Sequence, residues 1–260
     1  MGLDLTRGGD GMNSTLNIAP DNLTLAFQPI VRIVNEDTFE ISDYEVLLRS
    51  KDKKSFPAAI FEKIVNNESC NQMFWEWFTL EIKKVLTDKK VRVDINIDPH
   101  QFLYQSTWDF LDKMVEYNQQ ITIEITERVS QELNLKKGLI DTVKHIKDLG
   151  YRVALDDISS GQYSFKVVQE NIKGIDRVKL SLLIFNDDST DSKTKNFFIM
   201  SWINFAKTNN VELVIEGIED DVAAKEMLCH NIKLQQGFFW QVPQDLSLIH
   251  ISEPTRHSLI

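Results

Sequence analysis

The chain has 260 residues, 42% hydrophobic and 26% charged, which is the composition of an ordinary globular domain. Its 39 acidic residues outnumber its 29 basic residues and give a net charge of −10, which argues against a nucleic-acid polymer or an anionic membrane surface as the main partner. No apolar run reaches the roughly 18 residues that a bilayer-spanning helix needs. Two distant cysteines, Cys70 and Cys229, and no secretory leader predict a reducing, cytoplasmic compartment.

The two ends of the chain lack the periodic patterns of its middle. Residues 1–20 begin with a Gly- and Asp-rich stretch, and residues 245–260 carry Ser-Glu-Pro-Thr-Arg-His without periodicity. We interpret residues 1–20 as a leader that is partly non-native or disordered and residues 245–260 as a tail of non-native character. One domain is therefore expected over residues 21–244.

Eight apolar runs of strand length are spaced along this domain. They cover residues 23–31, 39–48, 91–97, 121–126, 152–155, 177–180, 211–215 and 234–240. Helical patterns lie between most of them, at residues 56–67, 71–87, 99–116, 130–149, 164–170, 196–208 and 220–230. Because strands alternate with helices and number eight, the sequence predicts an α/β fold, a closed (β/α)8 TIM-like barrel.

Three local patterns refine this expectation. The connection at residues 32–38 is too short for a crossover helix, so the first two strands should form a hairpin and one strand should run antiparallel. Residues 185–195 are polar enough to predict an exposed loop. Phe74, Trp75, Phe78, Ile82 and Val85 recur at helical spacing, and we interpret these side chains as helix-packing core rather than as a ligand platform.

An apolar run from Tyr151 ends in two adjacent carboxylates, Asp156 and Asp157, followed by Ser-Ser-Gly161. This pattern is typical of a buried strand whose C-terminal end carries acidic groups into a site. Taken alone, the pair fits a solvated turn equally well.

Polar side chains also lie at or near the ends of the other predicted strands. These side chains are Glu45, Asn96, Glu124, Glu127, Lys179, Glu216 and Gln236. Each has a structural alternative, such as an exposed strand-end acid or a lysine reaching solvent. In an α/β barrel, however, the C-terminal strand ends converge on one face, so the set should meet in one cup.

The chemistry of this cup favours a hard cation. The five histidines show no ligand spacing, which argues against zinc, whereas carboxylate and amide oxygens suit Mg²⁺ or Mn²⁺. A bridging aspartate flanked by further carboxylates can hold two cations in the arrangement used for phosphodiester hydrolysis. Metal ions would also convert an acidic cup into a phosphate site.

As a set, these motifs resemble the EAL family of bacterial cyclic di-GMP phosphodiesterases, over residues 23–243. The matching pieces are Phe27-Gln-Pro-Ile30, Glu45-Val-Leu47 with Arg49, Asn96, Glu124-Ile-Thr-Glu127, Asp156-Asp157, Lys179, Glu216-Gly-Ile-Glu219, Gln236-Gly237 and Pro243. The resemblance implies a barrel with one antiparallel strand, two Mg²⁺ or Mn²⁺ ions, a homodimer, and hydrolysis of cyclic di-GMP to linear pGpG.

The resemblance also implies a role for each matching residue. Glu45, Asn96, Glu124 and Asp156 would hold one metal, and Asp156, Asp157 and Glu216 would hold or orient around the second. Lys179 would sit beside the attacking water, Glu216 would be the base, and Gln236 would position water or substrate. Arg49 would pair with a phosphate, Leu47 would lie near a guanine, Gln28 would contact substrate, and Glu127 and Glu219 would be supporting residues.

The chain departs from the family pattern in four places. It has Glu-Val-Leu for Glu-Ala-Leu, Asp-Asp-Ile-Ser-Ser-Gly for Asp-Asp-Phe-Gly-Thr-Gly, Ser181 in place of an aspartate, and Ile215 in place of an alanine. The loop change and Ser181 keep a second hypothesis open, namely a catalytically silent receptor for cyclic di-GMP or a protein-interaction regulator.

Overall fold

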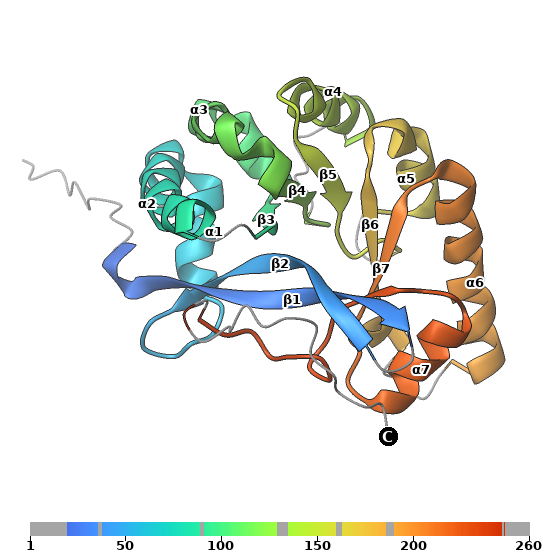
Figure 1. The fold of residues 1–260 in the computed structure, drawn as a ribbon. Helices are drawn as coiled ribbons and strands as arrows, with labels where there is room; N and C mark the ends of the chain where they lie inside the picture. The colour runs from blue at the N-terminus through green and yellow to red at the C-terminus, as the bar shows by residue number, and fades with distance from the viewer. Residues whose placement is uncertain are drawn as a thin grey trace, which may run out of the picture.

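A computed structural model describes residues 20–35, 38–88, 91–128, 135–159, 163–185, 190–245 and 247. Eight strands close a barrel in sequence order, and helices α2 to α6 follow one another around its outside (Figure 1). The strands are β1 Leu23–Asn35, β2 Thr38–Ser50, β3 Val93–Ile97, β4 Ile121–Ile125, β5 Arg152–Leu155, β6 Arg177–Ser181, β7 Glu212–Glu216 and β8 Leu234–Gln235. The predicted (β/α)8 barrel is confirmed.

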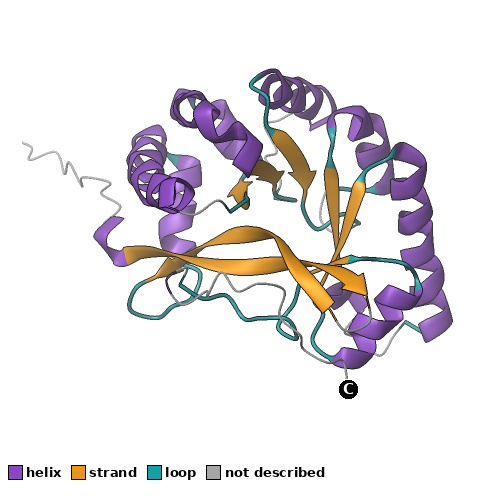
Figure 2. Cartoon of the chain, viewed as in Figure 1, coloured by secondary structure: helices purple, strands orange, loops and turns teal. Residues whose placement is uncertain are grey.

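Seven α-helices lie in the described part of the chain, outside the strands (Figure 2). They are α1 Ala58–Asn66, α2 Glu68–Asp88, α3 Gln105–Met114, α4 Leu135–Asp148, α5 Phe165–Asn171, α6 Ser192–Asn209 and α7 Asp221–Cys229. The predicted helix at 99–116 is divided, because 3-10 turns at Pro99–Leu103 and Val115–Gln120 flank α3. Of the predicted helix at 130–149, the first residues lie outside the described ones.

The first strand is the antiparallel one. β1 pairs antiparallel with β2 and with β8, whereas every other neighbouring pair is parallel. The predicted hairpin is therefore confirmed, although its tip, residues 36 and 37, lies outside the described residues.

The prediction of a long eighth strand was wrong, because β8 ends at Gln235 rather than at residue 240. Beyond it, the chain leaves the sheet and pairs with the loop after β7: the Ile218 amide donates to the Gln236 carbonyl at 3.1 Å and the Phe239 amide to the Ile218 carbonyl at 3.0 Å. A Cβ on Gly237 would lie 2.0 Å from the Ile218 carbonyl oxygen. Only glycine permits this approach, so the chain after β8 can lie directly against the backbone of the loop after β7.

The prediction of a loop at residues 185–195 was also wrong at its C-terminal end. α6 begins at Ser192, and the Asp191 side chain caps it by accepting hydrogen bonds from the Lys193 and Thr194 amides, both at 3.1 Å. Asp and Ser are typical of both loops and helix caps, which explains the error. Residues 186–189 lie outside the described part of the chain.

The main hydrophobic core lies between the strands and the helices. The α2 side chains of Phe74, Trp75, Phe78 and Ile82 are all at most 4% exposed, and Trp75 stacks on Phe110 of α3 with ring centroids 4.1 Å apart. Offset aromatic pairs of this kind add specific packing to the burial of area. The interpretation of these aromatics as core is confirmed.

The interior of the barrel is layered, because alternate residues of each strand point inward. Along β7, these are Glu212 near the N-terminal end, Val214 in the middle and Glu216 at the C-terminal end. Val214 packs with Ile30 and Leu234 in a small apolar cluster separate from the main core. This apolar layer separates a polar layer below from the cup of polar side chains above.

The lower polar layer is organised by Arg177, which is 0% exposed. Its guanidinium donates to Asp94 Oδ2 and Asp43 Oδ2, both at 2.7 Å, and to Glu212 Oε2 at 2.9 Å. A guanidinium can donate five hydrogen bonds in a fixed plane, and these contacts tie β6 to β2, β3 and β7 across the barrel.

Replacing Arg177 with Met should destabilise the fold by about 3–5 kcal/mol, because the buried Asp94 loses its ion-pair partner and the buried Asp43 keeps only the half-exposed Arg92. Urea unfolding followed by circular dichroism measures this change. Lys113→Met, at an exposed position of α3, should change the free energy of unfolding by less than about 0.5 kcal/mol. Equal effects of the two substitutions would contradict the assignment.

Glu212 should make stability depend on pH. Burial raises the pKa of its carboxyl, but Arg177 and Arg152 outweigh burial and lower this pKa from 4.5 to about 2. Since the folded pKa is lowered, the stabilisation is complete above pH 4.5 and is lost as the pH falls toward 2. The difference in unfolding free energy between the wild type and Glu212→Gln should therefore shrink over this range, and a difference independent of pH would contradict the prediction.

Candidate active site

The side chain of Lys179, near the C-terminal end of β6, is the centre of the site. It is 1% exposed, and carboxylates from four other strand ends surround it. Its Nζ lies 2.8 Å from Glu124 Oε1, 2.8 Å from Glu216 Oε1, 3.1 Å from Glu45 Oε2 and 3.7 Å from Asp156 Oδ1. The structure thus brings together in one cup the acidic groups that the sequence placed at successive strand ends.

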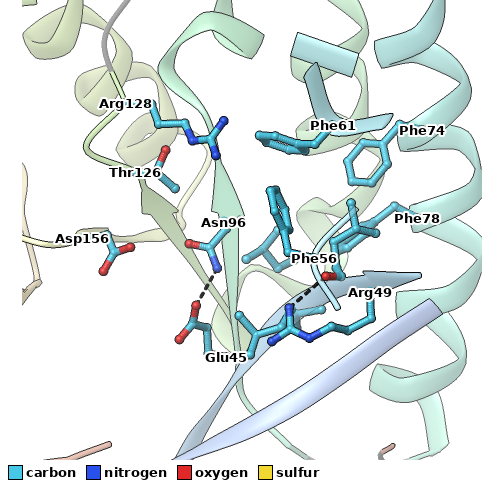
Figure 3. Close-up of a pocket in the computed structure, with 14 residues that line it drawn as sticks. Glu45, Arg49, Phe56, Phe61, Phe74, Phe78, Asn96, Thr126, Arg128 and Asp156 are labelled. Carbon is cyan, nitrogen blue, oxygen red and sulfur yellow. Dashed lines mark hydrogen bonds between the residues drawn. The ribbon is translucent and has the colours of Figure 1, made fainter. Parts of the chain in front are cut away.

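Two amide side chains fix Glu45 in this cup. Asn96 Nδ2 donates to Glu45 Oε1 at 2.8 Å, and Gln236 Nε2 donates to Glu45 Oε2 at 2.6 Å (Asn96 and Glu45 are drawn in Figure 3). Gln236 Nε2 also lies 3.5 Å from Gln28 Oε1, which brings β1 into the network. Burial raises the pKa of Glu45, but Lys179 and the two amides outweigh burial and lower it, so Glu45 stays ionised.

The other carboxylates carry more negative charge than Lys179 can balance. Burial and the neighbouring carboxylates raise the pKa of Glu124 and of Asp156, and raise that of Glu216 to about 8. Burial also lowers the pKa of Lys179, yet the surrounding carboxylates raise it well above its usual value, so the lysine stays charged. The cup therefore has a deficit of positive charge.

A divalent cation fits this deficit. Among the described residues, Glu124 Oε2 and Gln236 Oε1 are buried without a hydrogen-bond partner, and buried polar atoms in that state call for an unseen ligand, water or ion. Oxygen donors of this kind suit Mg²⁺ or Mn²⁺, and a bound cation would add the missing positive charge.

A second acidic group lies on the rim of the cup. Carboxylate oxygens of Glu127, Asp156 and Asp157 lie within 4.8 Å of one another. Burial is the largest cause that raises the pKa of the Asp157 carboxyl, and the negative charges of Asp156 and Glu127 raise it further, to about 6. Glu127, to which the resemblance assigns a supporting role, lies beside the aspartate pair in the structure.

Two cavities open beside the cup. The larger, about 390 Å³, is lined by predicted substrate residues and by the loops after β7 and β8. Its predicted site residues are Gln28, Glu45, Leu47, Arg49, Asp156, Asp157, Glu216, Glu219 and Gln236, and it also contains Ser181, Leu183, Gly217, Gly237, Phe238 and Pro243. Glu219, predicted as a supporting residue, thus faces the cavity.

The smaller cavity, about 210 Å³, has a different character (Figure 3). It shares Glu45, Leu47, Arg49 and Asp156 with the larger cavity. Its remaining lining is Val46, Leu48, Phe56, Phe61, Phe74, Phe78, Ile95, Asn96, Thr126 and Arg128. Sequence reasoning missed Phe56, Thr126 and Arg128, because no spacing or motif distinguishes them from surface residues.

The loop after the aspartate pair is attached to the cup through the backbone. The Ile158 amide donates to the Lys179 carbonyl at 3.0 Å, and the Ser159 amide donates to the Tyr163 carbonyl at 2.9 Å. Ile158 is 1% exposed, so it fills the apolar position where the family has Phe. Ser159 has φ +73°, a left-handed conformation that favours glycine, and it stands where the family has Gly. Residues 160–162 lie outside the described residues.

A family model described as EAL domain matches residues 14–243. The chain belongs to the EAL domain family. This membership agrees with the resemblance inferred from the motifs and with the barrel that carries them.

Curated relatives of this EAL domain include cyclic di-GMP phosphodiesterase PdeA of Borreliella burgdorferi, 25% identical over 86% of this chain and 36% of the relative. Probable cyclic di-GMP phosphodiesterase PdeG of Escherichia coli is 23% identical over 56% of this chain and 28% of that protein. The chain thus spans about a third of the length of these two relatives.

Solved structures share the fold. An EAL domain protein from Listeria monocytogenes superposes with a TM-score of 0.70 at 24% identity, over 87% of this chain and 90% of that one. BlrP1 of Klebsiella pneumoniae, solved as a manganese/cyclic di-GMP complex, superposes with a TM-score of 0.69 at 19% identity, over 87% of this chain and 57% of that one. At these identities, the likeness concerns the fold.

Ser159→Gly should stabilise this EAL domain by about 0.5–1 kcal/mol, because glycine adopts the left-handed conformation without the steric cost that serine has there. Glycine also has more conformational freedom in the unfolded chain, and this entropy offsets only part of the gain. Ser159→Ala, which keeps the strain, is the matched control and should give no gain. Urea unfolding compares the three proteins, and identical stabilities of the Gly and Ala variants would contradict the prediction.

Proposed function

We propose that this EAL domain is a phosphodiesterase that hydrolyses cyclic di-GMP to linear pGpG with two divalent cations, Mg²⁺ or Mn²⁺. The observation that carries the proposal is the cup in which four strand-end carboxylates surround the buried Lys179 beside a cavity of about 390 Å³. The names of the curated relatives and the manganese/cyclic di-GMP complex of BlrP1 support this substrate and this type of cofactor.

The proposed metal ligands follow the acidic groups of the cup. Glu45, Asn96, Glu124 and Asp156 would hold one cation, and Asp156, Asp157 and Glu216 the other. Bound cations would supply Lewis-acid stabilisation of the phosphodiester and of the attacking water.

The chain's own residues would bind the substrate and move the proton. Glu216, which Lys179 holds at 2.8 Å, would be ionised once the cations are bound and would then accept the proton of the attacking water. Lys179 would orient that water and stabilise negative charge on the phosphate. Gln236, which already positions Glu45, would orient water or substrate.

Residues of the larger cavity would recognise the dinucleotide. The guanidinium of Arg49 would pair with a phosphate, for which its planar donors are suited. Leu47 would pack near a guanine, and Gln28 would contact the substrate from β1. Glu127 and Glu219 would support the two rims of the cavity.

Assembly and location form part of the same proposal. Phe197 of α6 is a 65% exposed apolar side chain, of the kind that the proposed homodimer would cover. Within the described part of the chain, Cys70 and Cys229 form no disulfide, which fits the proposed cytoplasmic location. Among the described residues, no helix is long and apolar enough to cross a bilayer.

One observation favours an alternative, a receptor that binds cyclic di-GMP without hydrolysing it. Ser181 stands where the family has an aspartate, and its Oγ accepts a hydrogen bond from the Leu183 amide at 3.3 Å. The cavity therefore lacks one carboxylate that the family pattern contains.

Incubation of the protein with cyclic di-GMP and either Mg²⁺ or Mn²⁺ should yield pGpG, measured by chromatography. Glu45→Ala and Asp156→Asn should each reduce turnover by roughly a hundredfold or more, because each removes a proposed cation ligand. Asp112→Asn, at an exposed position of α3, is the matched control. Tight binding without pGpG under either metal would favour the receptor, and the absence of both binding and turnover would contradict both functions.

A further inference from the structure

We infer that Gln101 is a positioning residue for the proposed reaction, because it fixes the turn after β3 and thereby holds Asn96 at the cation site. Gln101 lies in the 3-10 turn Pro99–Leu103, is 0% exposed and lines neither of the two cavities beside the cup. The inference rests on the proposed function and adds a residue that acts without touching cation or substrate.

Asn96 lies where the sheet supports β3 on one side. The pairing of β2 with β3 ends at Val46 and Ile95. At Asn96, β3 is therefore paired on the β4 side, with Glu124. The Asn96 Nδ2 donates to Glu45 Oε1 at 2.8 Å (Figure 3), which leaves Oδ1 as the atom that can face a cation. The direction of Oδ1 consequently depends on how the chain after β3 is held.

The turn after β3 is fixed by a reciprocal cap. Asp98 Oδ1 accepts a hydrogen bond from the His100 amide at 2.8 Å, and the Asp98 amide donates to Gln101 Oε1 at 3.0 Å. The Gln101 amide donates to the Asp98 carbonyl at 2.9 Å. Together these bonds fix the backbone at Asp98, two residues after Asn96.

A second set of hydrogen bonds ties Gln101 to α2 and α3. Gln101 Nε2 donates to Asn71 Oδ1 at 2.8 Å. Asn71 Nδ2 donates to Ser106 Oγ at 2.7 Å and to Thr107 Oγ1 at 2.9 Å, and the Thr107 hydroxyl donates to the Gln101 carbonyl at 2.7 Å. All four side chains are at most 7% exposed. Gln101 thus connects the turn to two helices that the aromatic core holds in place.

The polar character of this network indicates a role in geometry. Burying an amide side chain costs free energy that its hydrogen bonds only offset, so apolar side chains of the same shape would be about as stable here. Hydrogen bonds, unlike apolar contacts, fix both distance and direction. Groups behind a metal ligand orient that ligand in this way and tune its affinity for the metal.

Cation binding by Gln101→Leu tests the inference. Loss of the anchor should raise the Kd for Mn²⁺ roughly 10- to 100-fold, the usual effect of removing a group that orients a metal ligand. Electron paramagnetic resonance of free Mn²⁺ measures this constant. Asn71→Leu keeps the bond between Asp98 and Gln101, so it should raise the Kd by a smaller factor. It is also the second variant if Gln101→Leu fails to fold.

Tyr151→Phe is the matched control for lost stability. The buried Tyr151 hydroxyl donates to the Leu111 carbonyl at 2.6 Å, so this variant also removes a buried hydrogen bond from the core without touching the turn. Urea unfolding without metal should give a lower midpoint for both Tyr151→Phe and Gln101→Leu. Only Gln101→Leu should change the Kd for Mn²⁺.

A double-variant cycle tests whether Gln101 acts through Asn96. Asn96→Ala should raise the Kd for Mn²⁺ by itself, and binding stays measurable because three carboxylates remain as proposed ligands of this cation. Adding Gln101→Leu to Asn96→Ala should raise the Kd no further. Additive effects would overturn the inference, because Gln101 would then influence the cation by another route.

The outcomes distinguish this inference from the proposed function. If the wild type binds Mn²⁺ and yields pGpG, but Gln101→Leu and Asn71→Leu leave the Kd unchanged, the inference is overturned while the proposed function stands. An equal change in Kd for Tyr151→Phe would overturn it as well. If the wild type binds Mn²⁺ without yielding pGpG, the proposed function fails, and the same Kd values still decide the role of Gln101. A wild type that binds no divalent cation would overturn both.

Discussion

The barrel depends on two buried cations that stand two residues apart on β6. Arg177 and Lys179 point into the same interior because strand side chains alternate, and each gathers carboxylates from other strands. The lower cation donates to two aspartates and a glutamate, and Arg92 and Arg152 add further positive charge at Asp43 and Glu212. The upper cation is outnumbered by its carboxylates, which leaves a charge deficit where the chemistry is proposed to occur.

This contrast explains why two similar clusters have different consequences. Around Arg177, the opposing charges lie within 2.7 to 2.9 Å and hold the strands together. Around Lys179, burial acts on several carboxylates at once, so their protonation, the lysine and any bound cation are interdependent. The apolar layer of Ile30, Val214 and Leu234 keeps the two systems apart. Stability and proposed catalysis are thus assigned to opposite ends of the same strands.

Much of this architecture was predictable from the sequence, because apolar runs of strand length, a short first connection and polar residues at strand ends are local patterns. The convergence of Glu45, Glu124, Asp156 and Glu216 followed once a barrel was assumed. The end of β8 was not predictable, because it depends on the approach of Gly237 to the Ile218 backbone. The lining of the smaller cavity was not predictable for a related reason: it combines α1, α2, β2 and the segment after β4, and no local pattern records which of their side chains face the same cavity.

The antiparallel direction of β1 has a consequence for how the domain is connected. Leu23 pairs with Ser50, at the C-terminal end of β2, and Phe27 forms a bridge with Gln244. The polypeptide therefore both enters and leaves the barrel at the end that carries the cup, with Pro243 itself in the cavity lining. In a barrel whose first strand is parallel, the entry point lies at the opposite end. In this domain, a force applied to the chain before β1 or after Gln244 therefore acts directly on the rim of the cup. The force does not have to pass along the strands to reach the rim.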